Sequence, residues 1–290
     1  MPRRSGLHWL GLLAGLLLGV AAPAASLAAA PRADDPRAFP ETGFRVADDA
    51  FWAYFGGRGG VENLGYPVSR RFTLQGFGVQ VFQRAVLQEQ PDGSVQPLNL
   101  LDEGLLPYTR VNGSTFPAAA GDLEMATPQT DQPDYARRVV EFVRAAAPDT
   151  WQGLPVNFGS TFFGTVTCRD AFPRGGCQES LLPLLDLELW GAPTSAPAFD
   201  PHNHDVVYQR FQRGILQYDP SCRCTQGVLL GDLFKSLLTG QDLPADLAAE
   251  AAASPYLRQY DPTRPQGLAH PERLADTDLT DAFSPDVGGG

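Results

Sequence analysis

The sequence predicts an α+β fold, in which two diverged copies of a small β repeat unit are combined with a few packed helices and a Pro-rich C-terminal tail. Two observations predict this class. A pair of short motifs recurs in the same order along the chain, and other segments show helical periodicity. The composition is 43% hydrophobic and 19% charged, which is typical of a folded chain rather than a disordered one.

The repeated motifs are a Gly-x-Pro turn and a Phe-Gln-Arg strand. The segment LGYPVS at residues 64–69 returns as WGAPTS at residues 190–195, and VQVFQRAVLQ at residues 79–88 returns as YQRFQRGILQ at residues 208–217. Glycine permits positive φ and proline fixes φ, so the first motif predicts a sharp break in chain direction. The short strands that follow bury little surface alone, so each copy must pack against a neighbour.

These patterns divide the chain into five segments. Residues 1–30 form a predicted signal peptide, and residues 31–106 form the first repeat unit. Residues 107–133 are rich in Pro, Gly, Ala and Thr and are interpreted as a linker. Residues 134–260 hold a helix and the second repeat unit. Residues 261–290 are Pro-rich and acidic, which predicts an extended and partly disordered tail.

Three helices are expected in the second half of the chain. Apolar residues recur at helical spacing over residues 134–147, with Asp134 as the N-cap and Pro148 as the terminator. Two more helices are predicted over residues 232–238 and 244–253, the second of them rich in alanine.

The N-terminal segment predicts export from the cell. It begins with Arg3 and Arg4, continues with an apolar run over residues 7–20, and ends in an Ala-rich stretch that suits signal peptidase. A retained membrane anchor is the alternative interpretation. No later stretch approaches the length of a membrane span, so no membrane contact is expected after cleavage. The predicted location is therefore secreted, either extracellular or at the cell surface.

The charge restricts the possible partners. The formal net charge is −11, and cleavage would remove two arginines and no acidic residue. An acidic surface does not neutralise phosphates, so nucleic acid is excluded as a partner. Walker A and Gly-x-Gly-x-x-Gly patterns are absent from the sequence, so no cofactor is predicted.

All four cysteines follow the predicted signal peptide. An even count in an oxidising compartment indicates disulfides. We favour pairing Cys168 with Cys177 and Cys222 with Cys224, and cross-pairing between the two groups is the alternative. The spacing within each group departs from that of zinc ligands, which disfavours a zinc site.

Two polar pairs are candidates for chemistry. His202 and His204 lie two residues apart near Asp200 and Asp205, so an extended segment would place both rings on one face for a metal ion. The alternative for this segment is an ordinary polar hairpin loop.

Asp186 and Glu188 form the second pair. In a strand both carboxylates would face one side, as glycoside hydrolysis requires of paired acids. A strand with a solvated acidic face, or a helix of the same composition, is the alternative. No known hydrolase motif accompanies the pair, so no catalytic residue is predicted.

The remaining candidates are repeated arginines and aromatic side chains. Arg84 and Arg213 each follow Phe-Gln, and a guanidinium can bind a carboxylate or stack on a sugar ring. Their alternative role is to hold each unit together through salt bridges or backbone hydrogen bonds. Aromatic faces can carry glycan binding, although the same side chains could also fill the core. The aromatic candidates are Trp52, Tyr54, Tyr66, Trp190 and Tyr208.

The first copy resembles a repeat of secreted proteins from Chloroflexi-type bacteria, and it is more distantly similar to the LGFP repeat of actinobacterial cell-wall proteins. The matching motifs are FWAYF at residues 51–55, LGYP at residues 64–67 and VQVFQR at residues 79–84. The resemblance spans residues 50–103 and 186–234. It implies an extracellular, non-catalytic module, often joined to enzymes that act on the cell wall.

Three functions follow as hypotheses. The first is a secreted, non-catalytic bacterial protein that associates with cell-wall or extracellular glycan through aromatic stacking and arginine hydrogen bonds. The second is an extracellular hydrolase acting on glycan or peptidoglycan. The third is a structural or protein-binding component of the cell surface.

Overall fold

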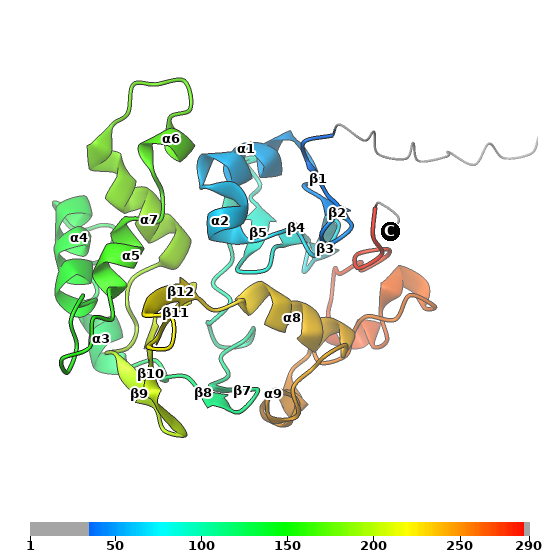
Figure 1. Cartoon of the computed structure of the whole chain (residues 1–290). Helices are drawn as coiled ribbons and strands as arrows, with labels where there is room; N and C mark the ends of the chain where they lie inside the picture. The colour runs from blue at the N-terminus through cyan, green and yellow to red at the C-terminus, as the bar shows by residue number, and fades with distance from the viewer. Residues whose placement is uncertain (1–34, 287–290) are drawn as a thin grey trace, which may run out of the picture. The chain divides into compact units, whose positions relative to one another are not determined.

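The computed structural model describes residues 35–286, so the predicted signal peptide lies outside the described residues. The described chain mixes helices with small antiparallel sheets, which confirms the α+β class. Figure 1 shows the first repeat, coloured blue to cyan, and the second, coloured green to yellow. Both repeats belong to one compact unit.

The first repeat begins with a small hairpin and two helices and continues into a four-stranded meander. The hairpin consists of β1 (Ala38–Phe39) and β2 (Phe44–Arg45), and the helices are α1 (Asp49–Gly57) and α2 (Gly60–Leu64). The strands pair in sequence order: β3 (Phe72–Leu74), β4 (Phe77–Val81), β5 (Val86–Glu89) and β6 (Val95–Pro97).

The second repeat also contains a four-stranded meander, and more helices precede its turn motif. Before the turn motif lie α4 (Tyr135–Ala146), α5 (Phe158–Phe163), α6 (Cys168–Ala171), the 3-10 helix η1 (Glu179–Leu181) and α7 (Leu182–Trp190). The strands again form an antiparallel meander: β9 (Ala198–Asp200), β10 (Asn203–Arg210), β11 (Ile215–Asp219) and β12 (Cys224–Gly227).

Matching hydrogen bonds hold the turn motif against the strand motif in both repeats. The hydroxyl of Ser69 accepts from the backbone N–H of Val81 at 2.8 Å, and the hydroxyl of Ser195 accepts from that of Arg210 at 2.9 Å. Both serines are buried. The equivalent geometry shows that the sequence repeat is also a structural repeat.

The glycine of each turn motif is required by its conformation. Gly65 and Gly191 end α2 and α7 with φ near +76° and +71°, a region that glycine adopts without steric cost. A Cβ on Gly65 would lie 2.6 Å from the Cβ of Gln83, and one on Gly191 would lie 2.5 Å from that of Gln212. The turn therefore packs directly on the Phe-Gln-Arg segment.

The phenylalanine of each strand motif is the centre of its repeat's core. Phe82 stacks on Phe55 of α1, with ring centroids 5.4 Å apart, and Phe211 stacks on Phe162 of α5, with centroids 5.5 Å apart. Phe82 and Phe211 are fully buried. The phenylalanine of the strand motif thus anchors the core in both copies.

The two repeats exchange the segments that follow their sheets. After β12, the N–H of Asp232 donates to the carbonyl oxygen of Gln83 at 3.1 Å, and a Cβ on Gly231 would lie 1.7 Å from the carbonyl oxygen of Phe82. After β6, the carbonyl oxygen of Leu101 accepts from Nη2 of Arg210 at 2.6 Å. Each strand motif is therefore covered by the other repeat.

The three predicted helices of the second half are confirmed as α4, α8 (Leu230–Thr239) and α9 (Ala245–Glu250), which continues into η2 (Ala251–Ala253). Val139 and Val143 form the buried face of α4. Asp134 occupies the N-cap position but makes no capping hydrogen bond, and its carboxylate instead lies 3.4 Å from Arg137.

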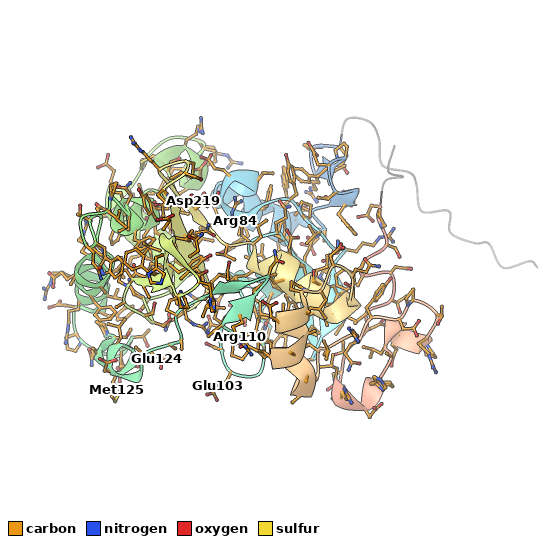
Figure 2. The ribbon with its side chains drawn as sticks, turned by 60° about the horizontal axis from the view of Figure 1, so that its bottom comes forward. Arg84, Glu103, Arg110, Glu124, Met125 and Asp219 are labelled. Carbon is orange, nitrogen blue, oxygen red and sulfur yellow. A yellow bond between two sulfur atoms is a disulfide. The ribbon has the colours of Figure 1, made fainter. Side chains whose placement is uncertain are left out.

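The segment predicted as a linker contains regular structure. It holds the hairpin of β7 (Arg110–Val111) and β8 (Ser114–Thr115), and the short helix α3 (Gly121–Ala126). Arg110, labelled in Figure 2, pairs with Glu250 of α9 at 2.7 Å. Pro and Gly here mark turns between short elements, which composition alone does not distinguish from a linker.

The segment predicted as an extended tail is packed, at least to residue 286. It contains the 3-10 helices η3 (Pro265–Gly267) and η4 (Pro271–Arg273), and Asp278 exchanges backbone hydrogen bonds with Thr73 of β3 at 2.9 and 3.2 Å. Its buried apolar residues are spaced too widely to give a periodic signal. They are Leu268, Leu274, Leu279 and Ala282.

Candidate functional site

Two grooves occupy equivalent positions at the boundary between the repeats. The Arg84 groove has a volume of about 280 Å³, and the Arg213 groove has a volume of about 680 Å³. Figure 2 shows Arg84 and Glu124, one residue from each groove, well separated from one another. The molecule thus has two grooves built on one repeated plan, and Arg84 and Arg213 also line a third, smaller cavity together.

Each groove combines an acid and an arginine of one repeat with the last strand of the other. Glu62 and Arg84 of the first repeat lie with Gln226 of β12, and Glu188 and Arg213 of the second repeat lie with Gln96 of β6. Gln96 pairs with Gln88 and Gln226 pairs with Gln217, which are equivalent register positions, so the two sites are related by the duplication.

The repeated arginines bind the ends of the preceding helices. Nη1 of Arg84 donates to the carbonyl oxygens of Val61 and Glu62 in α2 at 3.4 and 3.3 Å. Nη1 of Arg213 donates to the equivalent carbonyl oxygens of α7 at 3.3 and 3.1 Å. A cation near the carbonyl end of a helix is favourable, so both arginines stabilise their turns.

The surroundings of the two guanidinium groups differ. Burial lowers the pKa of both arginines, and for Arg84 only Asp232 opposes this effect. For Arg213, Tyr54 opposes this lowering of the pKa most, followed by the carboxylates of Glu188 and Asp102. Nε of Arg213 is buried without a hydrogen-bond partner among the described residues, whereas Arg84 has no such buried atom.

Trp190 brings an aromatic surface to the Arg84 groove. Its Nε1 donates to the hydroxyl of Thr165 at 2.8 Å, and its ring is half-buried. A Cβ on Gly227 would lie 2.9 Å from the indole ring and 3.6 Å from Cδ of Arg84. Trp190 and Arg84, both predicted from the sequence as binding residues, therefore meet beside Gly227 although they belong to different repeats.

Polar, mainly uncharged side chains complete the Arg84 groove. Among the described residues, the side chains of Thr161 and Gln226 make no hydrogen bond, so their polar groups are free to bind a ligand. Ser160 is engaged by Asp149 at 2.7 Å. None of Thr161, Thr165 and Gln226 is among the binding residues predicted from the sequence. Extending the repeat by one strand would have aligned Gln96 with Gln226 and indicated the last of these.

Two other aromatic candidates lie in the core. Tyr208 is buried and packs edge-on against Phe116, with centroids 4.9 Å apart. Tyr54 is nearly buried beneath the guanidinium of Arg58, which lies 5.0 Å from its ring centre. Burial raises the pKa of Tyr54 well above its usual value, and Glu188 adds to this effect.

Trp52 and Tyr66 are half-buried and lie outside both grooves. Trp52 stacks on Phe55 at 5.7 Å, and Tyr66 packs edge-on against Phe39 at 5.7 Å. Their contacts are with other aromatic rings of the first repeat, which is the packing role considered as the alternative.

Asp186 and Glu188 lie on the helix α7 rather than on a strand, and their carboxylates diverge. Asp186 is fully buried, with one oxygen accepting from the N–H of Val166 at 2.8 Å and the other without a partner among the described residues. Burial raises its pKa to about 7. Glu188 instead pairs with Arg58 at 2.6 Å. The helix that was the alternative interpretation of this segment is therefore observed, and the two carboxylates do not share one face.

His202 lies in the exposed turn between β9 and β10, and His204 lies in the exposed first part of β10. The backbone N–H of His202 donates to Asp200 at 2.9 Å, and the ring of His204 lies 3.2 Å from the carbonyl oxygen of Pro201. Within residues 35–286, no group of three or more His, Cys, Asp or Glu side chains is placed to hold a metal ion. The segment has the polar hairpin geometry that was the alternative interpretation.

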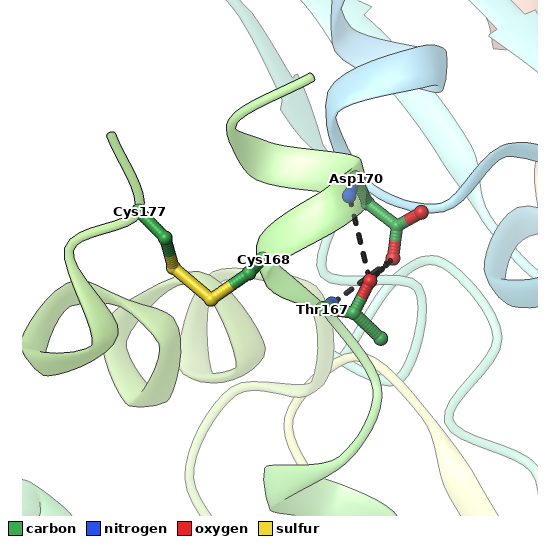
Figure 3. The surroundings of a disulfide bond; sticks show 4 residues. All are labelled: Thr167, Cys168, Asp170 and Cys177. Atoms are coloured by element: carbon green, nitrogen blue, oxygen red, sulfur yellow. Dashed lines mark hydrogen bonds between the residues drawn. A yellow bond between two sulfur atoms is a disulfide. The ribbon is translucent and has the colours of Figure 1, made fainter. Parts of the chain in front are cut away.

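The disulfides follow the favoured pairing. Cys168 is joined to Cys177 and Cys222 to Cys224, with Cα atoms 5.5 and 5.2 Å apart. Figure 3 shows the first of these beside the cap of α6, where Thr167 and Asp170 bind one another's backbone N–H groups. Both bonds are compatible with an oxidising, extracellular compartment.

Comparisons with protein-family models, with curated proteins and with solved structures returned no match. The resemblance to the Chloroflexi-type and LGFP repeats therefore stays a prediction from the motifs. Across residues 35–286, the structure contains no helix with the length and apolar character needed to span a bilayer.

Proposed function

We propose that the protein is a secreted, non-catalytic module that binds an extracellular or cell-wall glycan in the Arg84 groove. The observation that carries the proposal is the meeting of Trp190 and Arg84 in one open groove beside Gly227. An aromatic face binds the apolar face of a sugar ring, and a guanidinium binds its oxygen atoms.

The remaining groove residues support the same ligand class. Thr161 and Gln226 offer hydroxyl and amide groups that are not engaged by the protein, and such groups can exchange hydrogen bonds with sugar hydroxyls. The diverging carboxylates of Asp186 and Glu188 support a binding role rather than hydrolysis by this pair.

Affinity electrophoresis of the folded chain, in gels containing different neutral and acidic polysaccharides and isolated cell-wall material, tests the proposal. We expect at least one polymer to retard the wild-type protein. The Thr161→Val/Gln226→Ala variant should bind that polymer about tenfold more weakly, because two hydrogen bonds are lost.

Gln96→Ala in the equivalent strand is the matched control and should bind like the wild type. Unchanged mobility of the folded wild-type chain in every gel would overturn the proposal. Equal losses in the double variant and in Gln96→Ala would place binding outside the Arg84 groove.

A further inference from the structure

The guanidinium of Arg84 has one edge that the protein does not use. Nη1 donates to the carbonyl oxygens of α2. Nε and Nη2 have no hydrogen-bond partner among residues 35–286, and both atoms are accessible to solvent. No carboxylate of the described chain lies within 4.0 Å of Arg84. Nε and Nη2 form the edge of the guanidinium that binds a carboxylate through two parallel hydrogen bonds.

The charges around Arg84 leave this edge available. Asp232 is the carboxylate that acts on Arg84, and it also interacts with Lys235, which lies one turn further along α8. The carboxylate is therefore shared between two cations. An ordinary intramolecular ion pair does not neutralise Arg84.

The equivalent arginine of the second repeat has different surroundings. Arg213 interacts with the carboxylates of Glu188 and Asp102, and its groove is also lined by Glu124. Its Nε is buried. Since Glu188 and Asp102 are the counterparts of Glu62 and Asp232, the Arg213 groove differs by its additional acid, Glu124, and by the buried Nε of its arginine, and it serves as an internal reference.

We infer that the Arg84 groove binds a sugar unit that carries a carboxylate, such as a uronic acid. The carboxylate would accept from Nε and Nη2 of Arg84, and the sugar ring would lie on Trp190, which lines the same groove beside Gly227. This inference rests on the proposed glycan-binding function and specifies its ligand.

The negative charge of Glu62 in the Arg84 groove provides a test of the ligand's charge. It is exposed, it lines the same groove, and its side chain makes no hydrogen bond within the described chain. A carboxylate on the ligand would be repelled by Glu62, whereas an amine on the ligand would be attracted. The effect of neutralising Glu62 therefore has opposite signs for the two kinds of ligand.

The experiment compares oligogalacturonate with its methyl ester by titration calorimetry on the full exported chain. The two probes differ in charge and share the same sugar ring. We expect the acid to bind about tenfold more tightly than the ester at low salt, and the difference to shrink as salt is raised.

Arg84→Met should weaken binding of the acid by about tenfold and leave binding of the ester unchanged, because only the charge-assisted hydrogen bonds are lost. Glu62→Gln should strengthen binding of the acid by about threefold. Glu124→Gln changes the net charge equally but lies in the Arg213 groove, so it is the matched control and should have no effect.

If Arg84→Met does not fold, as thermal unfolding would show, Arg84→Lys keeps the cation and should retain part of the preference for the acid. Equal affinity for acid and ester, or weaker acid binding by Glu62→Gln, would overturn the inference. Binding of a neutral polysaccharide without any preference for acid would leave the proposed function standing. Failure to bind any polysaccharide would overturn both.

Discussion

The two repeats have nearly the same backbone hydrogen bonds and different grooves. In both, a buried serine and a positive-φ glycine attach the turn motif to the strand motif. At the equivalent positions of the turn motifs, however, the first repeat has Leu64 where the second has Trp190. Backbone contacts thus fix where a groove forms, whereas a few side chains decide its chemistry.

The largest effect is expected where one repeat covers the other. Gly231→Ala should lower the free energy of unfolding by about 4 kcal/mol, because its Cβ would lie 1.7 Å from the carbonyl oxygen of Phe82, a backbone atom that cannot move aside. Chemical denaturation measures the loss. Gly121→Ala in α3, where a Cβ has open space, is the control and should cost nothing. Equal stability of both variants would refute the exchange of segments.

Next come the paired turn glycines. Gly65→Ala and Gly191→Ala should each cost about 3 kcal/mol, since both add a clash with a glutamine Cβ to the strain of a positive φ. Gly93 has a φ near +80° and open space around it, so Gly93→Ala measures the backbone strain without a steric clash. It should cost about 1 kcal/mol. Clearly unequal losses at Gly65 and Gly191 would show that the two turns are not energetically equivalent.

A pH-dependent difference is expected from Asp186, whose counterpart in the first repeat is Gly60. Burial raises the pKa of Asp186 in the folded protein to about 7, above the unfolded value near 3.9, so the folded state holds the proton more tightly. The contribution of this group is greatest below pH 4 and is lost as the pH rises towards 7.

Asp186→Asn should therefore be more stable than the wild type at pH 8, by about 2 kcal/mol, and should have no advantage at pH 4. Denaturation curves at both pH values measure this. The amide keeps an oxygen for the N–H of Val166, which limits other effects of the change. An advantage of equal size at both pH values would contradict the assignment.

The smallest of the four effects concerns the paired serines. Ser69→Ala and Ser195→Ala should each cost about 1 kcal/mol, because each leaves one buried backbone N–H without its acceptor. Thermal unfolding of the two single variants and of the double variant measures the losses. If only one of the two variants lost stability, the serine hydrogen bonds of the two repeats would not be energetically equivalent.

Much of the repeat could be predicted because its motifs have direct physical meaning. Gly-x-Pro requires a turn, and the phenylalanine of Phe-Gln-Arg requires a core, so Phe82 and Phe211 were recognisable. The exchange between repeats could not be predicted, since a duplicated segment packs equally plausibly on its own copy or on the other. Asp186 was ambiguous because Leu residues alternate around it, a pattern compatible with either strand or helix.

The sequence predicted two binding residues of the Arg84 groove but not that they lie together, because the packing of one repeat on the other could not be predicted. Arg84 and Trp190 were each predicted as binding residues from their own copy. Their proximity depends on how the two copies pack against each other. The predictions of a linker over residues 107–133 and of an extended tail over residues 261–290 were wrong for a different reason. The buried residues of these segments, such as Phe116 and Leu279, are isolated among polar and turn-forming residues and leave no periodic trace.

The shared construction of the grooves limits how the molecule can lose function. Each groove takes its arginine from one repeat and its glutamine from the other, so neither repeat contains a whole groove. Local opening of either sheet would dismantle both grooves together. The number of intact grooves in a single molecule is then two or none, and a preparation with half of its binding capacity would consist of complete molecules mixed with inactive ones.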